Sequence, residues 1–350
     1  MRGRALIAGG GIAGLATARA LLRGGWDVEV RERAAGPPAT GTSLGMWPHA
    51  VAALRELGLD DLVQGGTAVA SSGELLRPDG RVLVRLEPRD AVHLVDRPTL
   101  LAALAAGLPD GAVRWGTPAP HPGDLPPVDA VVAADGIGSA LRRARFGPAA
   151  APRPLGTAAV RGTADAPCPQ LAETWGRGRM FGTTPRRDGR TNVYACFRTP
   201  VLPVEDVADP RAALREVFTG WHPGVTGAIE ALDPGSLDVR VLHDVRPLRS
   251  TTTGNVALVG DAAHAMAPHL GRGACEALAD AVALARHLLA AADVPTALRG
   301  YDRERRRATA RVVRASRVLN SVSTAQHLTG ARDAALALAG RAAAGFSARR

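Results

Sequence analysis

The sequence predicts an α/β fold in which a sheet of parallel strands is interleaved with an antiparallel sheet. Short apolar runs that end in glycine or Asp-Gly and lead into helical patterns, such as Arg4–Ala8 before residues 9–22, are typical of parallel strands with crossover helices. From residue 157 to 250 the pattern changes to short strands separated by turns, which favours an antiparallel sheet.

Composition restricts the class of protein. The chain has 350 residues, 46% of them hydrophobic and 22% charged, so it is globular and large enough for one or two domains. All 43 residues counted as Lys or Arg are arginine, and the net charge of +10 is compatible with an anionic cofactor or an acidic substrate but is poor evidence for nucleic acid. Three separated cysteines without a CxxC pair argue against disulfides or a metal site. No apolar run reaches membrane-span length, so we expect a soluble, cytoplasmic protein.

The first motif lies at the N-terminus. Gly9, Gly11 and Gly14 fit the GxGxxG pattern between an apolar strand and an amphipathic helix, and Glu32 ends a second strand. In this context the first glycine makes the turn, the second admits a pyrophosphate, the third allows close helix–strand packing, and the acid binds an adenosine ribose. The motif therefore predicts a Rossmann-like domain that binds FAD or NAD rather than NADP.

The next segments add weaker candidates. Residues 41–59 are predicted to form a glycine-rich loop and a helix, where Met46 and Trp47 either flank a flat ring or belong to the core. A hairpin is predicted over residues 67–86. Arg97, just before a helix, is placed to meet a phosphate or a flavin edge, with a surface salt bridge as the alternative.

Two further strand-to-loop junctions carry an aspartate. Asp135-Gly136 follows an apolar strand, and Gly260-Asp261 follows the predicted strand Val256–Val259. The Asp261 carboxylate could accept hydrogen bonds from sugar-alcohol hydroxyls, or it could be an ordinary helix cap. Pro268 and Gly271-Arg272-Gly273 then precede a helix predicted over residues 274–289, whose start offers free backbone N–H groups to an anionic or electron-rich group.

In this order, GxGxxG with Glu32, then Asp135-Gly136, then Gly260-Asp261 with Pro268 and Gly271-Arg272-Gly273 resemble the single-component (group A) FAD-dependent aromatic monooxygenases. The resemblance covers nearly the whole chain. It implies the para-hydroxybenzoate hydroxylase (PHBH) fold: a Rossmann-like FAD-binding domain (GR2/PHBH-type) interleaved with an antiparallel-sheet substrate domain. We expect the FAD-binding domain at residues 1–66, 93–156 and 250–325, the substrate domain at 67–92 and 157–249, and a C-terminal helix or tail at 326–350.

The resemblance also implies roles for single residues. Glu32 and Arg33 would hold the ADP half of FAD, Arg97 would lie near the flavin, and Asp261 would contact the ribitol. The implied cofactor-binding residues are Gly9, Gly11, Ile12, Ala13, Gly14, Glu32, Arg33, Met46, Arg97, Asp135, Gly136, Gly260, Asp261, Pro268, Gly271, Gly273 and Ala274. The flavin-facing loop gives catalytic candidates Pro268, His269 and Gly271, and the substrate candidates are Trp47, Arg179, Arg186 and His269.

The implied activity is hydroxylation or epoxidation of an aromatic or polyketide-like small molecule with NADPH or NADH and O₂, through a C4a-hydroperoxyflavin, in secondary metabolism. Two alternatives stay open: an FAD-dependent reductase or dehydrogenase of the geranylgeranyl-reductase type, and a non-catalytic FAD-binding partner protein. The chain departs from the family pattern at His49, where asparagine is common, and at Arg272, where glutamine is frequent. We expect no metal, no nucleic acid partner, and a monomer or homodimer.

Overall fold

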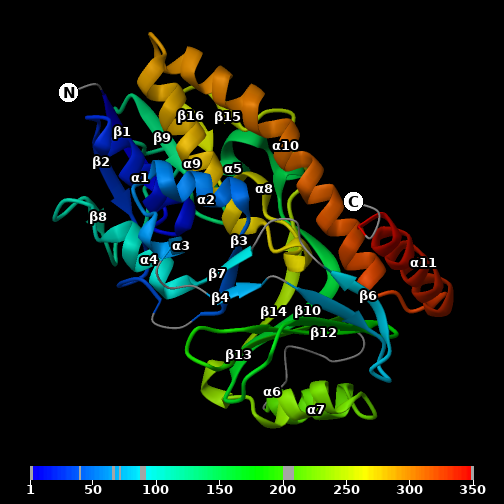
Figure 1. The fold of residues 1–350 in the computed structure, drawn as a ribbon. Helices are drawn as coiled ribbons and strands as arrows, with labels where there is room; N and C mark the ends of the chain where they lie inside the picture. Colours follow the sequence, from blue (N-terminus) through cyan, green and yellow to red (C-terminus); the bar gives the residue numbers. More distant parts are fainter. Residues whose placement is uncertain are drawn as a thin grey trace.

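The computed structural model describes residues 3–38, 41–64, 68–70, 72–86, 92–199 and 209–347. A mainly parallel sheet forms one end of the molecule and a large antiparallel sheet forms the other (Figure 1). A long helix, α10 (Val294–Ser323), runs along one side from the first sheet to the second (Figure 1). The fold class expected from the sequence is thus confirmed.

The first sheet carries the Rossmann-like part of the fold. Its order is β15 (Thr252–Thr253), β16 (Val256–Leu258), β9 (Ala130–Ala133), β1 (Arg4–Ala8), β2 (Asp27–Arg31) and β8 (Val113–Arg114). All its pairings are parallel except that of β15 with β16. Every residue of β9 and β16 is buried, as expected for strands covered on both faces. Helices α1 (Ile12–Arg23) and α9 (Gly273–Ala290) pack on each other beside these strands.

The second sheet is the larger one. Its order is β14 (Asp238–Asp244), β10 (Arg153–Ala164), β13 (Thr191–Arg198), β12 (Arg179–Pro185), β11 (Leu171–Trp175), β5 (Gly73–Leu76) and β6 (Val82–Leu86). The pairing is antiparallel except between β11 and β5. Helices α6 (Pro210–Val217) and α7 (Pro223–Glu230) cover the face that points away from the first sheet (Figure 1). The side chains of Phe181, Phe218 and Trp221 pack edge to face there.

A small third sheet was missed by the sequence patterns. It consists of β3 (Ser43–Met46), β7 (Val92–Asp96) and β4 (Ala68–Ala70). The hairpin expected over residues 67–86 is therefore shorter: only β5 and β6 form it, because β4 pairs with β7 instead. Residue 67 itself lies outside the described residues.

The other elements connect these sheets. They are α2 (Pro48–Glu56), α3 (Asp61–Gln64), α4 (Arg97–Ala105), α5 (Ala140–Phe146), α8 (Asp261–His264), α11 (Thr329–Ser347) and the 3₁₀ turns η1 (Pro148–Ala150), η3 (Pro234–Ser236) and η4 (Pro268–Leu270). Helix α11 packs against β6, so the expected C-terminal helix begins at Thr329 and extends to Ser347. Among the helices that the structure describes, none combines the length and the apolarity that crossing a membrane requires.

Helix α10 fastens the two ends of the molecule together. At about 1.5 Å per residue, its 30 residues extend roughly 45 Å. Near its start Tyr301 donates a hydrogen bond to the carbonyl oxygen of Leu258 in the first sheet, at 2.8 Å. Near its end Arg317 donates to both carboxylate oxygens of Asp244 in the second sheet, at 2.7 and 2.8 Å. The arginine-rich sequence of this helix therefore has a structural use.

Candidate cofactor and substrate site

The three glycine-bearing motifs meet at the carboxyl ends of the parallel strands. Gly9 has a φ of +109°, and a Cβ on it would lie 2.3 Å from the carbonyl oxygen of Ala134, so the first loop packs directly against the Asp135-Gly136 loop. Gly260 has a φ of +56°, and its added Cβ would lie 2.8 Å from the Cβ of Ala13. Segments far apart in sequence therefore form one continuous loop surface, the position where doubly wound sheets bind their ligands.

Two helices begin at this surface without side-chain caps. The N-cap of α1 is Gly11, which has no side chain, and that of α9 is Arg272, whose guanidinium has no acceptor, so neither helix start has a side-chain cap. The first backbone N–H groups of both helices are available to an anionic or electron-rich ligand. A Cβ on Gly11 would meet no atom within 4 Å, so the space beside this residue is open.

Glu32 lies at the edge of the first loop. Its Oε2 accepts a hydrogen bond from the backbone N–H of Gly10 at 2.7 Å, and its Oε1 accepts one from Ala34 at 2.9 Å. The carboxylate is thereby fixed at the end of β2, beside the glycine loop, which is where the motif predicts a ribose-binding acid.

The Asp135 loop is held by a residue that had no assigned role. Asp135 Oδ2 accepts a hydrogen bond from Ala140 at 2.9 Å, while its Oδ1 is buried and has no partner among the described residues. Arg142 is fully buried and donates to the carbonyl oxygens of Ile137, Ala150 and Ala262, the last two at 2.8 and 2.9 Å. It therefore ties this loop to α8. The spacing of Arg142 from Asp135-Gly136 was visible in the sequence, but its burial was not.

Behind the Gly260 turn, buried charges join α8, α9 and α10. Asp280 accepts hydrogen bonds from the N–H of Gly260 at 2.9 Å and from Arg305 at 2.7 Å, and its Oδ2 lies 2.6 Å from His264 Nε2. Burial opposes ionisation of Asp280, but the charges and hydrogen bonds of His264 and Arg305 hold the pKa of this carboxyl below its usual range. The sequence feature that could have indicated this network is the presence of two acids, Glu276 and Asp280, on the buried face of an otherwise apolar helix.

Glu276 connects this network to the two positions that depart from the family pattern. Its carboxylate pairs with Arg305 and Arg272, each at 2.7 Å, and Oε1 lies 3.3 Å from His49 Nε2. Although burial opposes it, hydrogen bonds from these groups and the charge of Arg305 lower the pKa of Glu276. His49 and Arg272 therefore share one partner, which explains why both are charged or polar here.

Across from the loop surface, Arg161 of β10 projects from the large sheet. Its neighbours on the sheet alternate: Ala158 and Val160 belong to the core under α6 and α7, so Arg161 lies on the opposite face. The charges of Arg97 and Asp261 both act on the guanidinium of Arg161. Because Asp261 lies on the loop surface, Arg161 lies near that surface. Burial lowers the pKa of this guanidinium, against the charge of Asp238, which lies directly opposite it on β14. Among the described residues the guanidinium makes no hydrogen bond and no ion pair within 4 Å.

His269 faces Arg161 from the loop before α9. Both ring nitrogens of His269 are buried and lack a hydrogen-bond partner among the described residues. Burial, with a further contribution from the charge of Arg161, lowers the pKa of His269 to about 4. The imidazole is therefore neutral near pH 7 and offers one donor and one acceptor to a ligand.

A row of side chains crosses the same face of the sheet. Cross-strand partners place Arg161 beside Tyr194, Tyr194 beside Gly182, and Gly182 beside Glu173. The hydroxyl of Tyr194 donates to Glu173 Oε1 at 2.9 Å, and Trp175 Nε1 donates to Glu173 Oε2 at 2.9 Å. The sequence patterns identified none of these as site residues, because a single Arg, Tyr or Glu in a short strand carries no spacing signal.

The structure places the substrate candidates in different surroundings. Arg179 lies on the face covered by α6 and α7, with its guanidinium 5.9 Å from the centre of the Trp221 ring. Arg186 forms ion pairs with Asp96 at 3.1 Å and Asp188 at 3.4 Å, and so links the large sheet to β7. Neither arginine is brought into the row beside Arg161, whereas His269 faces that residue.

The remaining candidates divide between the core and the loop surface. Met46 is fully buried in an apolar cluster with Leu15 and Leu101, in agreement with the core interpretation. Trp47 lines a surface hollow with Leu270 and Arg272. The other predicted residues begin or follow the elements at the loops: Ile12 and Ala13 begin α1, Arg33 follows β2, Gly136 follows Asp135, Asp261 begins α8, Pro268 begins η4 and Gly271 follows it, and Gly273 and Ala274 begin α9. Arg97 begins α4, and its charge acts on Arg161.

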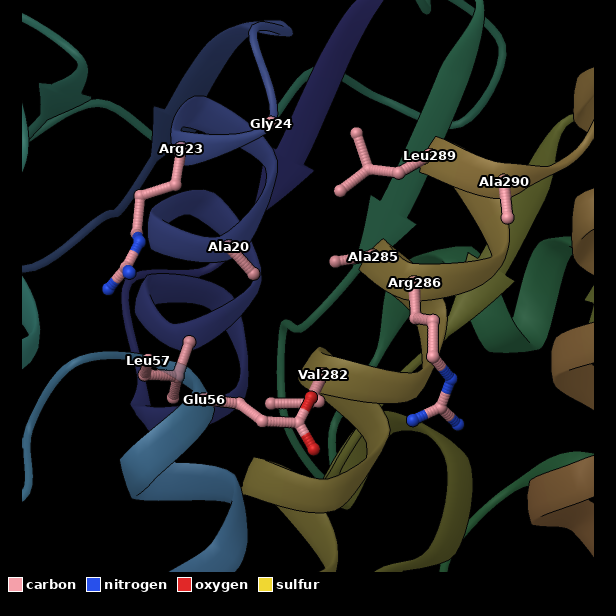
Figure 2. A pocket seen from close by; sticks show the side chains of 10 residues that line it. All are labelled: Ala20, Arg23, Gly24, Glu56, Leu57, Val282, Ala285, Arg286, Leu289 and Ala290. Carbon is pink, nitrogen blue, oxygen red and sulfur yellow. The ribbon is translucent and has the colours of Figure 1, made fainter.

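A separate groove lies between α1 and α9 (Figure 2). It is lined by residues near the C-terminal ends of both helices, including Ala20, Gly24, Leu289 and Ala290. The loop surface lies at the N-terminal ends of the same helices, and α1 is 12 residues or roughly 18 Å long. This groove is therefore distinct from the candidate site.

Fold and site together define a dinucleotide-binding flavoprotein. The family described as FAD binding domain matches residues 129–316. The chain is 33% identical to the aurachin C monooxygenase/isomerase of Stigmatella aurantiaca over 85% of this chain and 83% of that protein. It is 30% identical to the FAD-dependent urate hydroxylase of Klebsiella oxytoca, over 86% and 85% of the two chains. The chain therefore belongs to the FAD-dependent aromatic monooxygenases of the PHBH fold.

Solved structures agree with this assignment. Klebsiella pneumoniae HpxO in complex with FAD and uric acid superimposes with a TM-score of 0.85 at 26% identity, covering 95% of this chain and 92% of that one. A salicylate hydroxylase substrate complex shares the fold with a TM-score of 0.77 at 23% identity, covering 95% and 93%.

The residues present fit FAD. The glycine loop and the two uncapped helix starts suit a pyrophosphate and an electron-rich ring. The buried Asp135 Oδ1 has no partner among the described residues and can accept a hydrogen bond from a ligand. The protein is thus an FAD-dependent monooxygenase that uses NAD(P)H and O₂. Among the described residues no group of three or more His, Cys, Asp or Glu is arranged to hold a metal ion.

Proposed function

We propose that this monooxygenase hydroxylates a small aromatic or nitrogen-containing heteroaromatic compound of secondary metabolism, bound between the loop surface and the large sheet. The observation that carries the proposal is the row of Arg161, Tyr194 and Glu173 facing His269 across the junction of the two sheets. The ring nitrogens of His269 are buried without hydrogen-bond partners among the described residues, so they are available to a ligand that supplies such partners.

The names of relatives support this class of substrate. Beside the aurachin and urate enzymes, a 3-amino-4-hydroxybenzoate 2-monooxygenase of Streptomyces cremeus is 30% identical over 90% of this chain and 86% of that protein. Urate and 3-amino-4-hydroxybenzoate are ring-bearing compounds that carry hydroxyl or nitrogen groups. A zeaxanthin epoxidase is also similar, at 27% identity over 53% of its own length.

The residues of the chain bind the cofactor, orient the substrate and shield the site from water. When bound, FAD supplies the redox chemistry that joins oxidation of NAD(P)H to the activation of O₂. The glycine loop, Glu32 and Asp261 would hold the cofactor, and the backbone N–H groups at the start of α9 would stabilise negative charge on it. The large sheet closes the other side, where Arg161 and His269 fix the orientation of the substrate and exclude water.

We propose a division into two domains, supported by the presence of one mainly parallel and one mainly antiparallel sheet; β10, which begins at Arg153, and the pairing of β4 with β7 cross the boundaries expected from the sequence. Residues 1–66, 93–156 and 250–325 form the FAD-binding domain, and residues 67–92 and 157–249 form the substrate domain. The assignment of Asp261 to the ribitol is supported by its exposure at the loop surface beside Gly260. We expect the Asp261→Ala variant to purify with less than about a tenth of the wild-type FAD content, because its hydroxyl partners lose an acceptor. A cytoplasmic location, and a monomeric or homodimeric state, also remain predictions.

The test is aerobic consumption of NADPH and NADH by the FAD-loaded protein, with peroxide release followed in parallel. The panel contains phenols, hydroxylated N-heteroaromatics and alkenes. A heteroaromatic or phenol that accelerates NAD(P)H oxidation while peroxide stays low supports the proposal. If only alkenes do so, the proposal fails in favour of epoxidation; if no compound changes the rate and reduction is equally fast without one, the reductase alternative replaces it.

A further inference from the structure

Helix α10 carries a stripe of arginines along its exposed side. The helix runs along the outside of the molecule, from the first sheet to α11 (Figure 1). Residues spaced by three or four positions lie on the same side of a helix, and four exposed arginines have this spacing: Arg303, Arg307, Arg311 and Arg314. From the first to the last they extend over roughly 17 Å of helix. The opposite side of α10 is buried, for example at Thr309 and Val313.

The charge of this stripe is not compensated by the described part of the chain. None of the four arginines has a hydrogen bond or an ion pair with another described residue. The two acids of α10 pair with other cations: Asp302 with Arg306 at 3.2 Å, and Glu304 with Arg286 at 2.6 Å. Unlike the arginines of α10 that tie the two sheets together, those of the stripe are therefore free to bind an anionic partner.

The stripe continues into exposed apolar side chains. Val318 and Val322 follow Arg314 at the same helical spacing and are 61% and 36% exposed. Leu328, in the turn between α10 and α11, is 82% exposed and has a φ of +55°, an uncommon conformation for leucine. Of the six large hydrophobic side chains exposed among the described residues, four lie on α10, on α11 or in the turn between them. Apolar side chains gathered in this way mark an interaction surface, whereas scattered ones do not.

A hollow of about 280 Å³ borders the stripe. Its lining combines apolar side chains with two arginines: Trp47, Leu270, Arg272, Arg311, Val312 and Ala315. Tryptophan, aliphatic side chains and arginine occur together at the boundary between water and lipid headgroups, because each has an apolar body and, for tryptophan and arginine, a polar tip. The surroundings of the stripe therefore favour the same kind of partner as the apolar end of α10 does.

We propose that this surface docks on an anionic lipid membrane. The surface, which we call the α10 face, consists of the four arginines of the stripe with Val318, Val322 and Leu328. The guanidinium groups contact headgroup phosphates, and the valines and the leucine enter the boundary between the headgroups and the acyl chains. The α10 face is separate from the candidate site, so the proposal does not rest on the proposed function.

The apolar end of the α10 face distinguishes a membrane from other polyanions. A row of arginines alone fits any polyanion, including a nucleic acid or an acidic protein. A phosphate backbone offers no apolar layer to Val318 and Leu328. A bilayer with anionic lipids offers both partners in a fixed order, with negative charge at its surface and hydrocarbon directly beneath.

The two parts of the α10 face should respond differently to salt. A basic residue close to an anionic membrane strengthens binding about fivefold, so the four arginines together supply a gain of several hundredfold at most. This part is screened as the ionic strength rises. The gain from buried apolar side chains does not depend on screening, and it should persist in high salt.

The test measures binding of the FAD-loaded protein to lipid vesicles by flotation. One set of vesicles contains phosphatidylcholine alone, and the other an equal mixture of phosphatidylcholine and the anionic phosphatidylglycerol. The double variant Arg307→Gln/Arg311→Gln removes two charges from the stripe and keeps good helix formers. Its matched control is Arg81→Gln/Arg187→Gln, which removes two exposed charges without ion pairs from turns of the large sheet.

We expect the wild type to bind the mixed vesicles at least about tenfold more tightly than phosphatidylcholine alone. The stripe variant should lose at least about tenfold of this affinity, and the control should stay within about twofold of the wild type. Raising the salt from about 0.1 M to about 1 M shortens the Debye length from about 10 Å to about 3 Å and should remove most of the difference between the two proteins.

The apolar part is tested by Leu328→Asn. Asparagine adopts a positive φ more readily than leucine does, so the melting temperature should not fall. Binding to the mixed vesicles should nevertheless weaken at least about threefold, in low and in high salt alike. Unchanged binding in this variant would overturn the choice of a membrane as the partner.

Three further outcomes would also overturn the proposal. The first is equal binding of the wild type to the two kinds of vesicle. The second is an equal loss in the stripe variant and its control, which would show that only the net charge of the protein matters. The third is tighter binding of the wild type to a DNA duplex or to polyglutamate than to the mixed vesicles, which would assign the stripe to a soluble polyanion.

Discussion

The backbone N–H of Gly260 donates a hydrogen bond to Oδ2 of Asp280, 2.9 Å away and 20 residues further along the chain. This contact fixes the turn after β16, whose conformation at a φ of +56° depends on glycine. Because Asp280 also contacts His264 and Arg305, the turn that presents Asp261 is held from behind by a buried network. The geometry of the cofactor site therefore depends on residues that do not themselves lie on the loop surface.

Replacement of Asp280 by alanine should be strongly destabilising. It leaves His264 without its carboxylate partner and removes one of the two acids that face the buried Arg305. Removing one partner of a buried charge pair costs about 3–5 kcal/mol, and we expect a loss of that order in the free energy of unfolding, measured by urea denaturation with FAD present. Glu304, an exposed carboxylate that pairs with Arg286 and His287, is the control. Glu304→Ala should lower the free energy of unfolding by less than about 1 kcal/mol. Equal effects of the two substitutions would contradict the structural role of Asp280.

The glycine loop yields two substitutions with opposite expectations. In Gly14→Ala the new Cβ would lie 1.9 Å from the carbonyl oxygen of Gly9, so the loop itself must move and both stability and FAD affinity should fall. In Gly11→Ala the new Cβ meets no protein atom within 4 Å, and Gly11 has an ordinary extended backbone. Its melting temperature without FAD should change little, within about 1 kcal/mol of stability, because it lies at a helix N-cap.

FAD affinity should nevertheless fall at least about tenfold in Gly11→Ala, because a pyrophosphate must approach this backbone closely. Titration of the apoproteins with FAD, followed by flavin fluorescence, measures this. If Gly11→Ala binds FAD as tightly as the wild type does, the cofactor does not approach this glycine as predicted.

Asp244 should contribute more to stability than a surface ion pair does. It is fully buried and accepts hydrogen bonds from Arg153 at 2.6 Å and from Arg317 of α10 at 2.7 and 2.8 Å. Charge and hydrogen bonds from both arginines, working against burial, lower the pKa of this aspartate. We expect Asp244→Asn to cost about 2–4 kcal/mol near neutral pH. The stability that the carboxylate contributes is present above the pKa of an unfolded aspartate and should be lost as the pH falls through the lower folded-state value.

Denaturation of Asp244→Asn, Arg317→Gln and the double variant forms a cycle that isolates the link between α10 and the large sheet. Additive losses would show that the two residues do not interact.

We expect His269 to lower the stability of the folded protein as the pH falls below 6.5. Its pKa falls from an ordinary 6.5 to about 4 in the folded protein. Below pH 6.5 the unfolded chain therefore binds more protons at this residue than the folded chain does, so stability rises with pH and is lost as the pH falls towards 4. At pH 5 the loss from this group is about 2 kcal/mol relative to pH 7.5.

The His269→Gln variant should lose correspondingly less stability between pH 7.5 and 5, measured by urea denaturation of the FAD-loaded protein. His327→Gln, at an exposed position, controls for the simple loss of a histidine. If wild type and His269→Gln show the same pH dependence, His269 is not buried as the structure places it.

The glycines of the predicted cofactor site have a local signature in the sequence. Gly9, Gly14 and Gly260 each lie where a Cβ would collide with backbone or with a neighbouring Cβ. Glycine is therefore required at these positions, and the sequence shows it as a residue type at a fixed spacing. The strands that carry them were recognisable because buried parallel strands are short continuous apolar runs. The beginning of α9 was also found, because glycine and proline mark such boundaries.

The predicted substrate residues have no such local signature, and the structure places Arg179 and Arg186 away from the row beside Arg161. Arg179 and Arg186 were chosen because they lie on the predicted sheet and its turn, but alternation places Arg179 under α6 and α7, and Arg186 is paired with Asp96. Which face of a strand meets the cofactor depends on the packing of two sheets, and a shift of one residue reverses it. The small sheet of β3, β7 and β4 was missed because its strands are three to five residues long and separated in sequence.

The sequence by itself determined the fold class, the FAD cofactor and the family, because backbone constraints at glycine and the burial of apolar runs are local properties that leave a periodic pattern. Only the tertiary structure decided that Arg161, Tyr194 and Glu173 form one row facing His269, and that Asp280 holds Gly260. Those contacts join strands and helices that are distant along the chain, and their chemistry arises from desolvation, which no local pattern encodes.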